Sequence, residues 1–144
     1  MIKIVKTSTV PISLSVLLKG QLKFLSKYFE IVGVSSPGPE LGEIARREDV
    51  RVQEVHMERG INPLKDAVSL INMVKLLRKE RPMIIHSITP KAGLISMLAG
   101  WITGVPIRMH TFTGLIFPSK TGVLQKLLIM MDKLLCFAAT NIYP

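Results

Sequence analysis

Short apolar runs rich in β-branched residues alternate with longer stretches of helical periodicity along the whole chain. The short runs predict strands over residues 2–6, 29–34, 50–57, 83–88, 106–111 and 141–143. The longer stretches predict helices over residues 12–28, 40–48, 63–81, 90–103 and 122–139, with Pro or Gly at many of their boundaries. Runs that are apolar at consecutive positions are typical of parallel strands covered on both faces. The pattern therefore predicts an α/β fold: one Rossmann-like three-layer α/β/α domain with a mostly parallel sheet.

The predicted helix over residues 12–28 divides into an apolar face and a lysine face. At 100° per residue, one face collects Leu14, Leu17, Leu18, Leu22, Leu25 and Tyr28. Lys19, Lys23 and Lys27 form a ladder on the other face, near Ile12 and Val16. A plain solvated helix would be expected to carry Glu among its lysines, so the ladder favours contact with an anionic membrane surface. Simple solvation of the lysines is the alternative.

The predicted helix over residues 63–81 has a clear start signal. Asn62 can cap it, with Pro63 at its first position. The apolar stripe expected to face the core consists of Leu64, Ala67, Val68, Ile71, Val74 and Leu77.

Length and composition narrow the class of protein. A chain of 144 residues is long enough for one domain with a real core, and its single cysteine, Cys136, excludes an internal disulfide. Its three His residues are too scattered for a zinc cluster, so no metal is expected. The longest uncharged run, residues 92–107, is shorter than the ~20 residues that span a bilayer. We therefore expect a cytoplasmic protein.

The net charge of +9 is concentrated at the two ends of the chain. Residues 1–29 carry five Lys and no acid, and residues 81–144 carry six basic residues against Asp132 alone. A parallel sheet would bring both ends together, which predicts a positive surface for phosphate groups or anionic lipid. A basic nucleic-acid-binding Rossmann domain would also explain the charge, but aromatic residues make up only 6% of the chain. We therefore expect no nucleic-acid partner.

Several common active-site motifs are missing. Ligands of parallel α/β sheets bind at the loops that follow the carboxyl ends of the strands. The first of these loops, residues 7–13, lacks G-x-G-x-x-G, and the chain has neither G-x-x-x-x-G-K-[ST] nor G-x-S-x-G. Ordinary NAD binding, P-loop chemistry and a serine nucleophile are therefore disfavoured. Cys136 lies within an apolar helical stretch and is expected in the core.

The loops after the fourth and fifth runs carry the candidate chemistry. Thr89 can cap the following helix, whose N-terminus would offer an anion site together with Lys91, and Gly93 would let another chain or a ligand come close. The next loop contributes His110, Thr111, Thr113 and Gly114. Neighbouring strands could place His86 and His110 in one cleft, although a histidine in an apolar strand can also be a hydrogen-bonded core residue.

The sequences around these residues resemble a known family. The segments RPMIIHSITPKAG (81–93) and GVPIRMHTFTG (104–114) are similar to the N-terminal domain of GT-B glycosyltransferases. More narrowly, they resemble the glycosyltransferase family 4 enzymes of bacterial capsule and O-antigen polysaccharide biosynthesis, in which kPDIVHxHTPKAG precedes GVPxRIxTxHG. The resemblance covers nearly the whole chain. It implies a GT-B N-terminal domain on the acceptor side, and a C-terminal nucleotide-sugar-binding domain that is expected to be missing after Pro144.

The resemblance also implies an activity and a set of site residues. It implies metal-independent transfer of a sugar, without a cofactor, from a nucleotide-sugar to a polyprenyl-diphosphate-linked saccharide at the inner face of the cytoplasmic membrane. Residues 1–144 alone are expected to be inactive. His110 would orient or deprotonate the acceptor hydroxyl. The residues expected to line the cleft are His86, Thr89, Lys91, Gly93, Thr111, Thr113 and Gly114. A sugar-nucleotide epimerase of the same architecture is the alternative.

The sequence differs from the family pattern at three positions. Met83 replaces the acidic residue before the fourth strand, and Ile88 replaces the second His of H-x-H. Thr113 replaces the His of the terminal HG, so the usual His role passes to His110, three residues earlier. These changes indicate a subfamily with its own acceptor contacts or a weakened catalytic apparatus.

Overall fold

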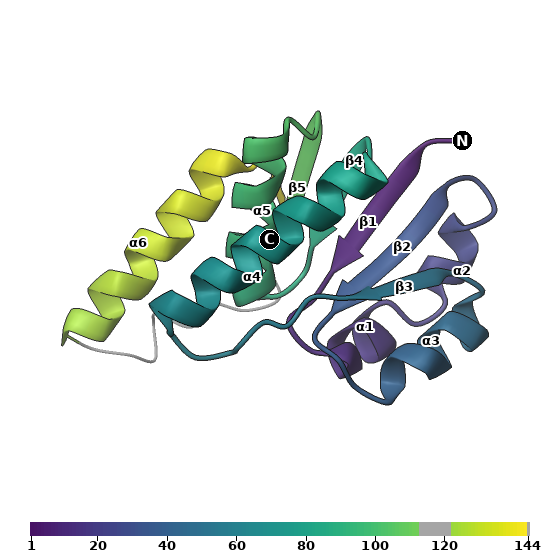
Figure 1. Cartoon of the computed structure of the whole chain (residues 1–144), viewed down its shortest axis with the longest axis horizontal. Helices are drawn as coiled ribbons and strands as arrows, with labels where there is room; N and C mark the ends of the chain where they lie inside the picture. The colour runs from purple at the N-terminus through teal and green to yellow at the C-terminus, as the bar shows by residue number, and fades with distance from the viewer. Residues whose placement is uncertain (113–121, 144) are drawn as a thin grey trace.

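A computed structural model describes residues 1–112 and 122–143 of the chain. In these residues, parallel strands form one sheet in the order β3-β2-β1-β4-β5-β6 (Figure 1). The strands are β1 (Lys3–Thr7), β2 (Glu30–Ser35), β3 (Arg51–Glu54), β4 (Ile84–Ser87), β5 (Ile107–Thr111) and β6 (Asn141–Tyr143). The chain order reverses between β1 and β4, which is the switch point of a doubly wound fold. The predicted three-layer α/β/α architecture is confirmed.

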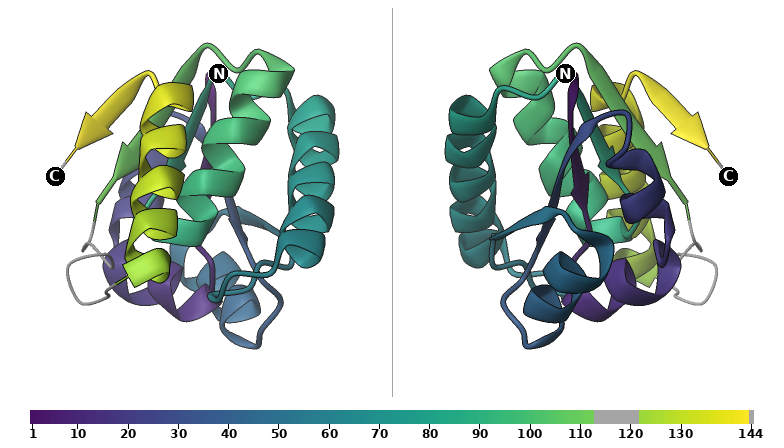
Figure 2. Two further views of the ribbon diagram at one scale, coloured as in Figure 1. Left: turned by 90° about the vertical axis from the view of Figure 1, so that its left-hand side faces the viewer. Right: turned by 90° about the vertical axis from the view of Figure 1, so that its right-hand side faces the viewer.

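The helices form two layers, one on each face of the sheet. They are α1 (Pro11–Leu17), α2 (Gln21–Leu25), α3 (Glu40–Glu48), α4 (Pro63–Glu80), α5 (Pro90–Thr103) and α6 (Gly122–Ala138). Helices α4, α5 and α6 lie side by side and pack on the face that contains Val5, Val32 and Ile85 (Figures 1 and 2). Helices α1 to α3 pack on the opposite face, against Ile4 and Ile31. Each face therefore has its own apolar core.

Proline and residues in the left-handed conformation set many of the helix boundaries. A Pro stands at the first position of α1, α4 and α5, where its missing N–H leaves no hydrogen bond unmade. The Asn62 side chain caps α4 as predicted, since its Oδ1 accepts from Lys65 N at 3.2 Å. Gly104 closes α5 at φ 76°, a conformation that suits glycine. Local sequence signals therefore determine many of the helix boundaries.

The single helix predicted over residues 12–28 is wrong. Helix α1 ends at Leu17, and α2 begins only after Gly20, whose φ of +79° breaks the helix. The break turns the chain, so Leu17 and Tyr28, expected to face the core, are exposed. Lys19, Lys23 and Lys27 are exposed as expected, but they lie on a helix–turn–helix surface and not on one ladder.

The apolar stripe predicted for α4 is also wrong in part. Leu64, Val68 and Ile71 are exposed, whereas the buried residues of the helix are Ser69, Met73, Leu77 and Glu80. The helix is apolar around much of its circumference, so periodicity alone did not identify the face that packs on α5.

Candidate functional site

The sheet register brings the candidate residues of the fourth and fifth strands together. Ser87 of β4 pairs with Thr7 of β1 on one side and with His110 of β5 on the other. Because side chains alternate across a strand, His86 points to the face of α1 and α2, while His110 lies on the face of α5. The two imidazoles are therefore on opposite faces of the sheet and do not share one cleft.

His110 is a buried residue of the α5 face. It is 1% exposed, its Nδ1 lies 2.6 Å from Ser87 Oγ, and its ring packs edge-on to Phe112 at 4.6 Å. Burial lowers the pKa of His110 to about 4, so the ring is neutral at pH 7. The expectation that His110 faces an open cleft as a base is therefore wrong: the ring has no exposed edge from which to reach an acceptor hydroxyl.

Gly93 makes room for the His110 ring. A Cβ built at Gly93 would lie 2.5 Å from His110 Cε1 and 2.7 Å from Leu135 Cδ1. Real side chains do not approach so closely, so glycine is required for this packing. The sequence correctly predicted a close approach at Gly93, but the neighbour is the protein's own histidine and not a ligand.

Lys91 is not free to bind an anion. Its Nζ donates to Asp66 Oδ1 and Oδ2 at 2.8 and 2.7 Å and to Gly60 O at 2.7 Å. The Lys91 side chain is 4% exposed and that of Asp66 is 18% exposed, so the lysine is buried and its partner is half-buried. An ammonium has three N–H donors, and all of them are used here. The pair instead ties the first turn of α4 to the first turn of α5, and the bond to Gly60 O adds the loop before α4.

Thr89 also plays a different role from the one expected. It stands at the N-cap position of α5, but its side chain makes no capping hydrogen bond there. Its Oγ1 instead accepts from Thr9 N and lies 2.9 Å from Thr9 Oγ1. Thr9 Oγ1 in turn accepts from Ala92 N at 3.2 Å and so caps α5 from another loop. Thr9 was not predicted from the sequence, although the run of hydroxyl residues over 7–9 at the end of a strand was a signal.

A row of hydrogen-bonded side chains runs across strands β1, β4 and β5 on the face of α1 and α2. Lys6 Nζ lies 2.7 Å from His86 Nδ1, and His86 Nε2 lies 2.8 Å from Thr111 Oγ1. Burial first, and then the charges of Lys6 and His110, lower the pKa of His86 to about 4. Lys6 is buried, whereas His86 and Thr111 are half-buried. Lys6 was not predicted as a site residue because a single lysine in an apolar strand belongs to no recognisable sequence motif.

The remaining predicted residues add little to the site. Thr113 and Gly114 lie outside the described residues. Cys136 is exposed on α6 and not in the core. Partial desolvation of its sulfur, and secondly the nearby Asp132, raise the pKa of its thiol. Within residues 1–112 and 122–143, no three His, Cys, Asp or Glu side chains are grouped so that they could hold a metal ion.

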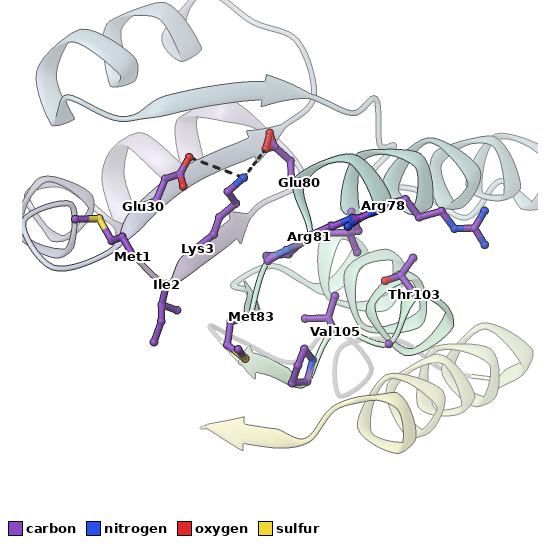
Figure 3. Close-up of a pocket in the computed structure, with 14 residues that line it drawn as sticks. Met1, Ile2, Lys3, Glu30, Arg78, Glu80, Arg81, Met83, Thr103 and Val105 are labelled. Carbon is purple, nitrogen blue, oxygen red and sulfur yellow. Dashed lines mark hydrogen bonds and ion pairs between the residues drawn. The ribbon is translucent and has the colours of Figure 1, made fainter.

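A hollow of about 1040 Å³ lies at the opposite edge of the sheet, where the strands begin (Figure 3). Its lysine and acids already have partners: Lys3 Nζ lies 3.4 Å from Glu80, which also accepts twice from Arg51. Arg78 and Arg81 also line the hollow. The hydrogen bonds from Arg51 are the main reason that the pKa of Glu80 lies below its usual value. Since parallel α/β folds bind ligands at the carboxyl edge, this hollow is not the candidate site.

The chain is similar in sequence to known glycosyltransferases. The sequence model of the glycosyl transferase 4-like domain matches residues 29–143. The capsular polysaccharide biosynthesis glycosyltransferase CapM of Staphylococcus aureus is 39% identical over 127 residues, which are 88% of this chain and 33% of the relative. The UDP-Gal:alpha-D-GlcNAc-diphosphoundecaprenol alpha-1,3-galactosyltransferase of Escherichia coli is 41% identical over 61 residues, or 42% of this chain and 16% of the relative. The chain thus spans a third or less of the length of these two relatives.

Solved structures share the fold at low sequence identity. A glycosyltransferase from Rickettsia africae matches with a TM-score of 0.66 and 19% identity, over 92% of this chain and 35% of its own. A UDP-GlcNAc 2-epimerase from Methanocaldococcus jannaschii matches with a TM-score of 0.61 and 14% identity, over 99% of this chain and 39% of its own. At such identities these matches show a common architecture and leave the activity open.

Proposed function

Because the chain belongs to the glycosyl transferase 4-like family, we propose that residues 1–144 form the acceptor-side part of a glycosyltransferase of surface polysaccharide synthesis. The observation that carries the proposal is the 39% identity with the capsular glycosyltransferase over 88% of this chain. The second relative is named for a diphosphoundecaprenol-linked acceptor, which supports a lipid-linked saccharide as the acceptor here. The donor is a nucleotide-sugar, held mainly by a second domain.

The site geometry supports a binding role for these residues more than a catalytic one. In the described part of the chain, neither histidine of the site is an accessible base: His110 is buried, and His86 is hydrogen-bonded through both ring nitrogens. The half-buried groups at the carboxyl edge of β4 and β5 are His86 and Thr111, which can orient an acceptor. The second domain would position the phosphates of the donor next to that acceptor.

A sugar-transfer assay tests whether residues 1–144 need a second domain for transfer. Nucleotide-sugars with a labelled sugar are incubated with a polyprenyl-diphosphate-linked saccharide and with residues 1–144. We expect no labelled lipid product, and the same assay should give product with a longer protein that joins these residues to a nucleotide-sugar-binding domain.

Two outcomes would contradict the proposal. Transfer by residues 1–144 alone would disprove the need for a second domain. An altered free nucleotide-sugar formed without acceptor would support the epimerase alternative, whose architecture is the same.

We further propose that the protein works at the surface of an anionic membrane, through α6. No helix in the described residues is long and apolar enough to cross a bilayer. Helix α6 instead exposes a stripe at the 4-3-4-3 spacing of one helix face: Val123, Leu127, Met130, Leu134 and Phe137. Exposed Lys126 and Lys133 lie beside the stripe, while Asp132 lies half-buried on the other side of the helix. An exposed apolar stripe with lysines along one border suits an anionic lipid surface.

Sedimentation with phosphatidylglycerol vesicles tests the membrane surface. Replacing Leu127, Met130 and Leu134 together with serine should weaken binding by at least about tenfold, because each buried side chain contributes on the order of 1 kcal/mol or more. The matched variant replaces Lys19, Lys23 and Lys27 with glutamine on the opposite face of the sheet. If those lysines made the contact, their loss would cost about 1 kcal/mol each, or roughly 100-fold in total. A large loss of vesicle binding in the lysine variant, with none in the α6 variant, would show that the membrane contact lies on α1 and α2.

A further inference from the structure

A cation is buried in the central strand with no acid beside it. Lys6 is 4% exposed, and no ion pair in residues 1–112 and 122–143 includes it. Residues 113–121 contain no Asp or Glu that could serve as its counter-ion. Burial lowers the pKa of Lys6 only to about 8, so the ammonium form dominates at pH 7. A buried charge is normally paired, because its desolvation costs several kcal/mol.

The hydrogen bonds of Lys6 have one possible direction. An ammonium only donates, so Gln21 Oε1 at 3.3 Å and His86 Nδ1 at 2.7 Å are its acceptors. A neutral His86 that accepts at Nδ1 carries its proton on Nε2 and donates it to Thr111 Oγ1 at 2.8 Å. The Thr111 hydroxyl therefore turns its own O–H away from His86. The result is a chain of donors that begins at a buried cation and ends at a hydroxyl.

The end of this chain lies where a ligand can reach it. Thr111 is the last residue of β5 and is half-buried, at the carboxyl edge of the sheet. The positive charge of Lys6 polarises each hydrogen bond in the chain, which makes the Thr111 O–H a stronger donor than an isolated hydroxyl. Such a donor favours an anionic oxygen over the hydroxyl of a neutral sugar, because hydrogen bonds to charged acceptors are the stronger ones.

We propose that Lys6, His86 and Thr111 form a phosphate-binding relay, in which Thr111 donates to a phosphate oxygen of the acceptor's diphosphate group and Lys6 supplies the compensating charge. The identity of the ligand as an acceptor diphosphate rests on the proposed function, whereas the anion chemistry does not. Lys6 and His86 act through Thr111 and are positioning residues.

Calorimetric titration of residues 1–144 with inorganic pyrophosphate tests the relay. Lys6→Met keeps the length of the side chain and removes the charge, and Thr111→Val removes only the final donor. Each variant should bind pyrophosphate at least about tenfold more weakly, the loss expected for a hydrogen bond to a charged group. Lys23→Met is the matched control, because Lys23 is an exposed lysine of α2 on the same face. It should change the affinity by less than about twofold.

The outcomes separate this inference from the proposed function. Wild-type affinity in Thr111→Val, or no binding of pyrophosphate by the unaltered chain, would overturn the relay. If Lys6→Met does not fold, the Thr111→Val result decides. Polyprenyl diphosphate, UDP and phosphatidylglycerol vesicles, titrated in parallel, distinguish the acceptor from the donor and from lipid headgroups. Loss of the Thr111 dependence while a lipid-linked saccharide still binds would refute the relay and leave the proposed function intact.

Discussion

Replacing Asp66 with alanine is expected to lower the free energy of unfolding by about 3–5 kcal/mol, the cost of leaving one partner of a buried ion pair uncompensated. Lys91 Nζ donates to both Asp66 carboxylate oxygens and is almost fully buried. Without the carboxylate, the ammonium keeps only Gly60 O as an acceptor. Urea unfolding followed by circular dichroism measures the change.

Two further variants show whether the effect comes from the buried charge. Glu58→Ala breaks the more exposed pair with Lys65 and should change the free energy of unfolding far less than Asp66→Ala does, because solvent screens an exposed ion pair. Replacing Asp66 with leucine and Lys91 with methionine together removes both charges and should recover most of the loss, since an apolar pair can substitute for a buried ion pair. Equal costs for Asp66→Ala and Glu58→Ala would show that the pair is not structural.

Gly93→Ala is expected to destabilise the domain by about 1–3 kcal/mol, although alanine is the better helix former. The new Cβ would meet the His110 ring at 2.5 and 2.6 Å and Leu135 at 2.7 Å. The ring cannot move away without losing its hydrogen bond to Ser87. The change in the urea midpoint measures the effect.

A second helical glycine provides the control for Gly93. Gly42 lies in α3, and a Cβ there would find its nearest neighbour, the flexible Arg46 side chain, at 3.7 Å. Gly42→Ala should therefore stabilise the domain by roughly 0.5–1 kcal/mol. A stabilising Gly93→Ala of the same size would mean that His110 does not occupy the space beside α5.

The sequence predicted the order of strands and helices because the signals for it are local. Pro63 and Pro90 mark helix starts, and the apolar runs give parallel strands. The break of residues 12–28 was missed because it depends on one residue, Gly20, in the left-handed conformation. The packing face of α4 was missed because Leu64 and Val68 are apolar yet exposed, and only the position of α5 decides which apolar residues are buried.

The positions of the candidate residues along the sheet were predicted, and their contacts were not. His86 and Thr111 reach the carboxyl edge as expected, because neighbouring parallel strands end there. The partner of Lys91 could not be predicted, since Asp66 lies 25 positions earlier and belongs to another helix. Nor could the burial of His110, which depends on a glycine of α5 and a serine of the neighbouring strand. Lys6 is significant because the fold buries it and no carboxylate of residues 1–112 and 122–143 forms an ion pair with it.

The most direct test of the account is which substrate residues 1–144 bind. The measurement is a pair of nuclear magnetic resonance titrations of the labelled chain, one with a short polyprenyl-diphosphate-linked saccharide and one with UDP-sugars. We predict saturable shifts with the lipid-linked saccharide, centred on residues at the carboxyl ends of β4 and β5, and much weaker binding of UDP-sugars, through their diphosphate alone, at the same concentrations. Saturable binding of a UDP-sugar, with none of the lipid-linked saccharide, would contradict the assignment of this domain to the acceptor side.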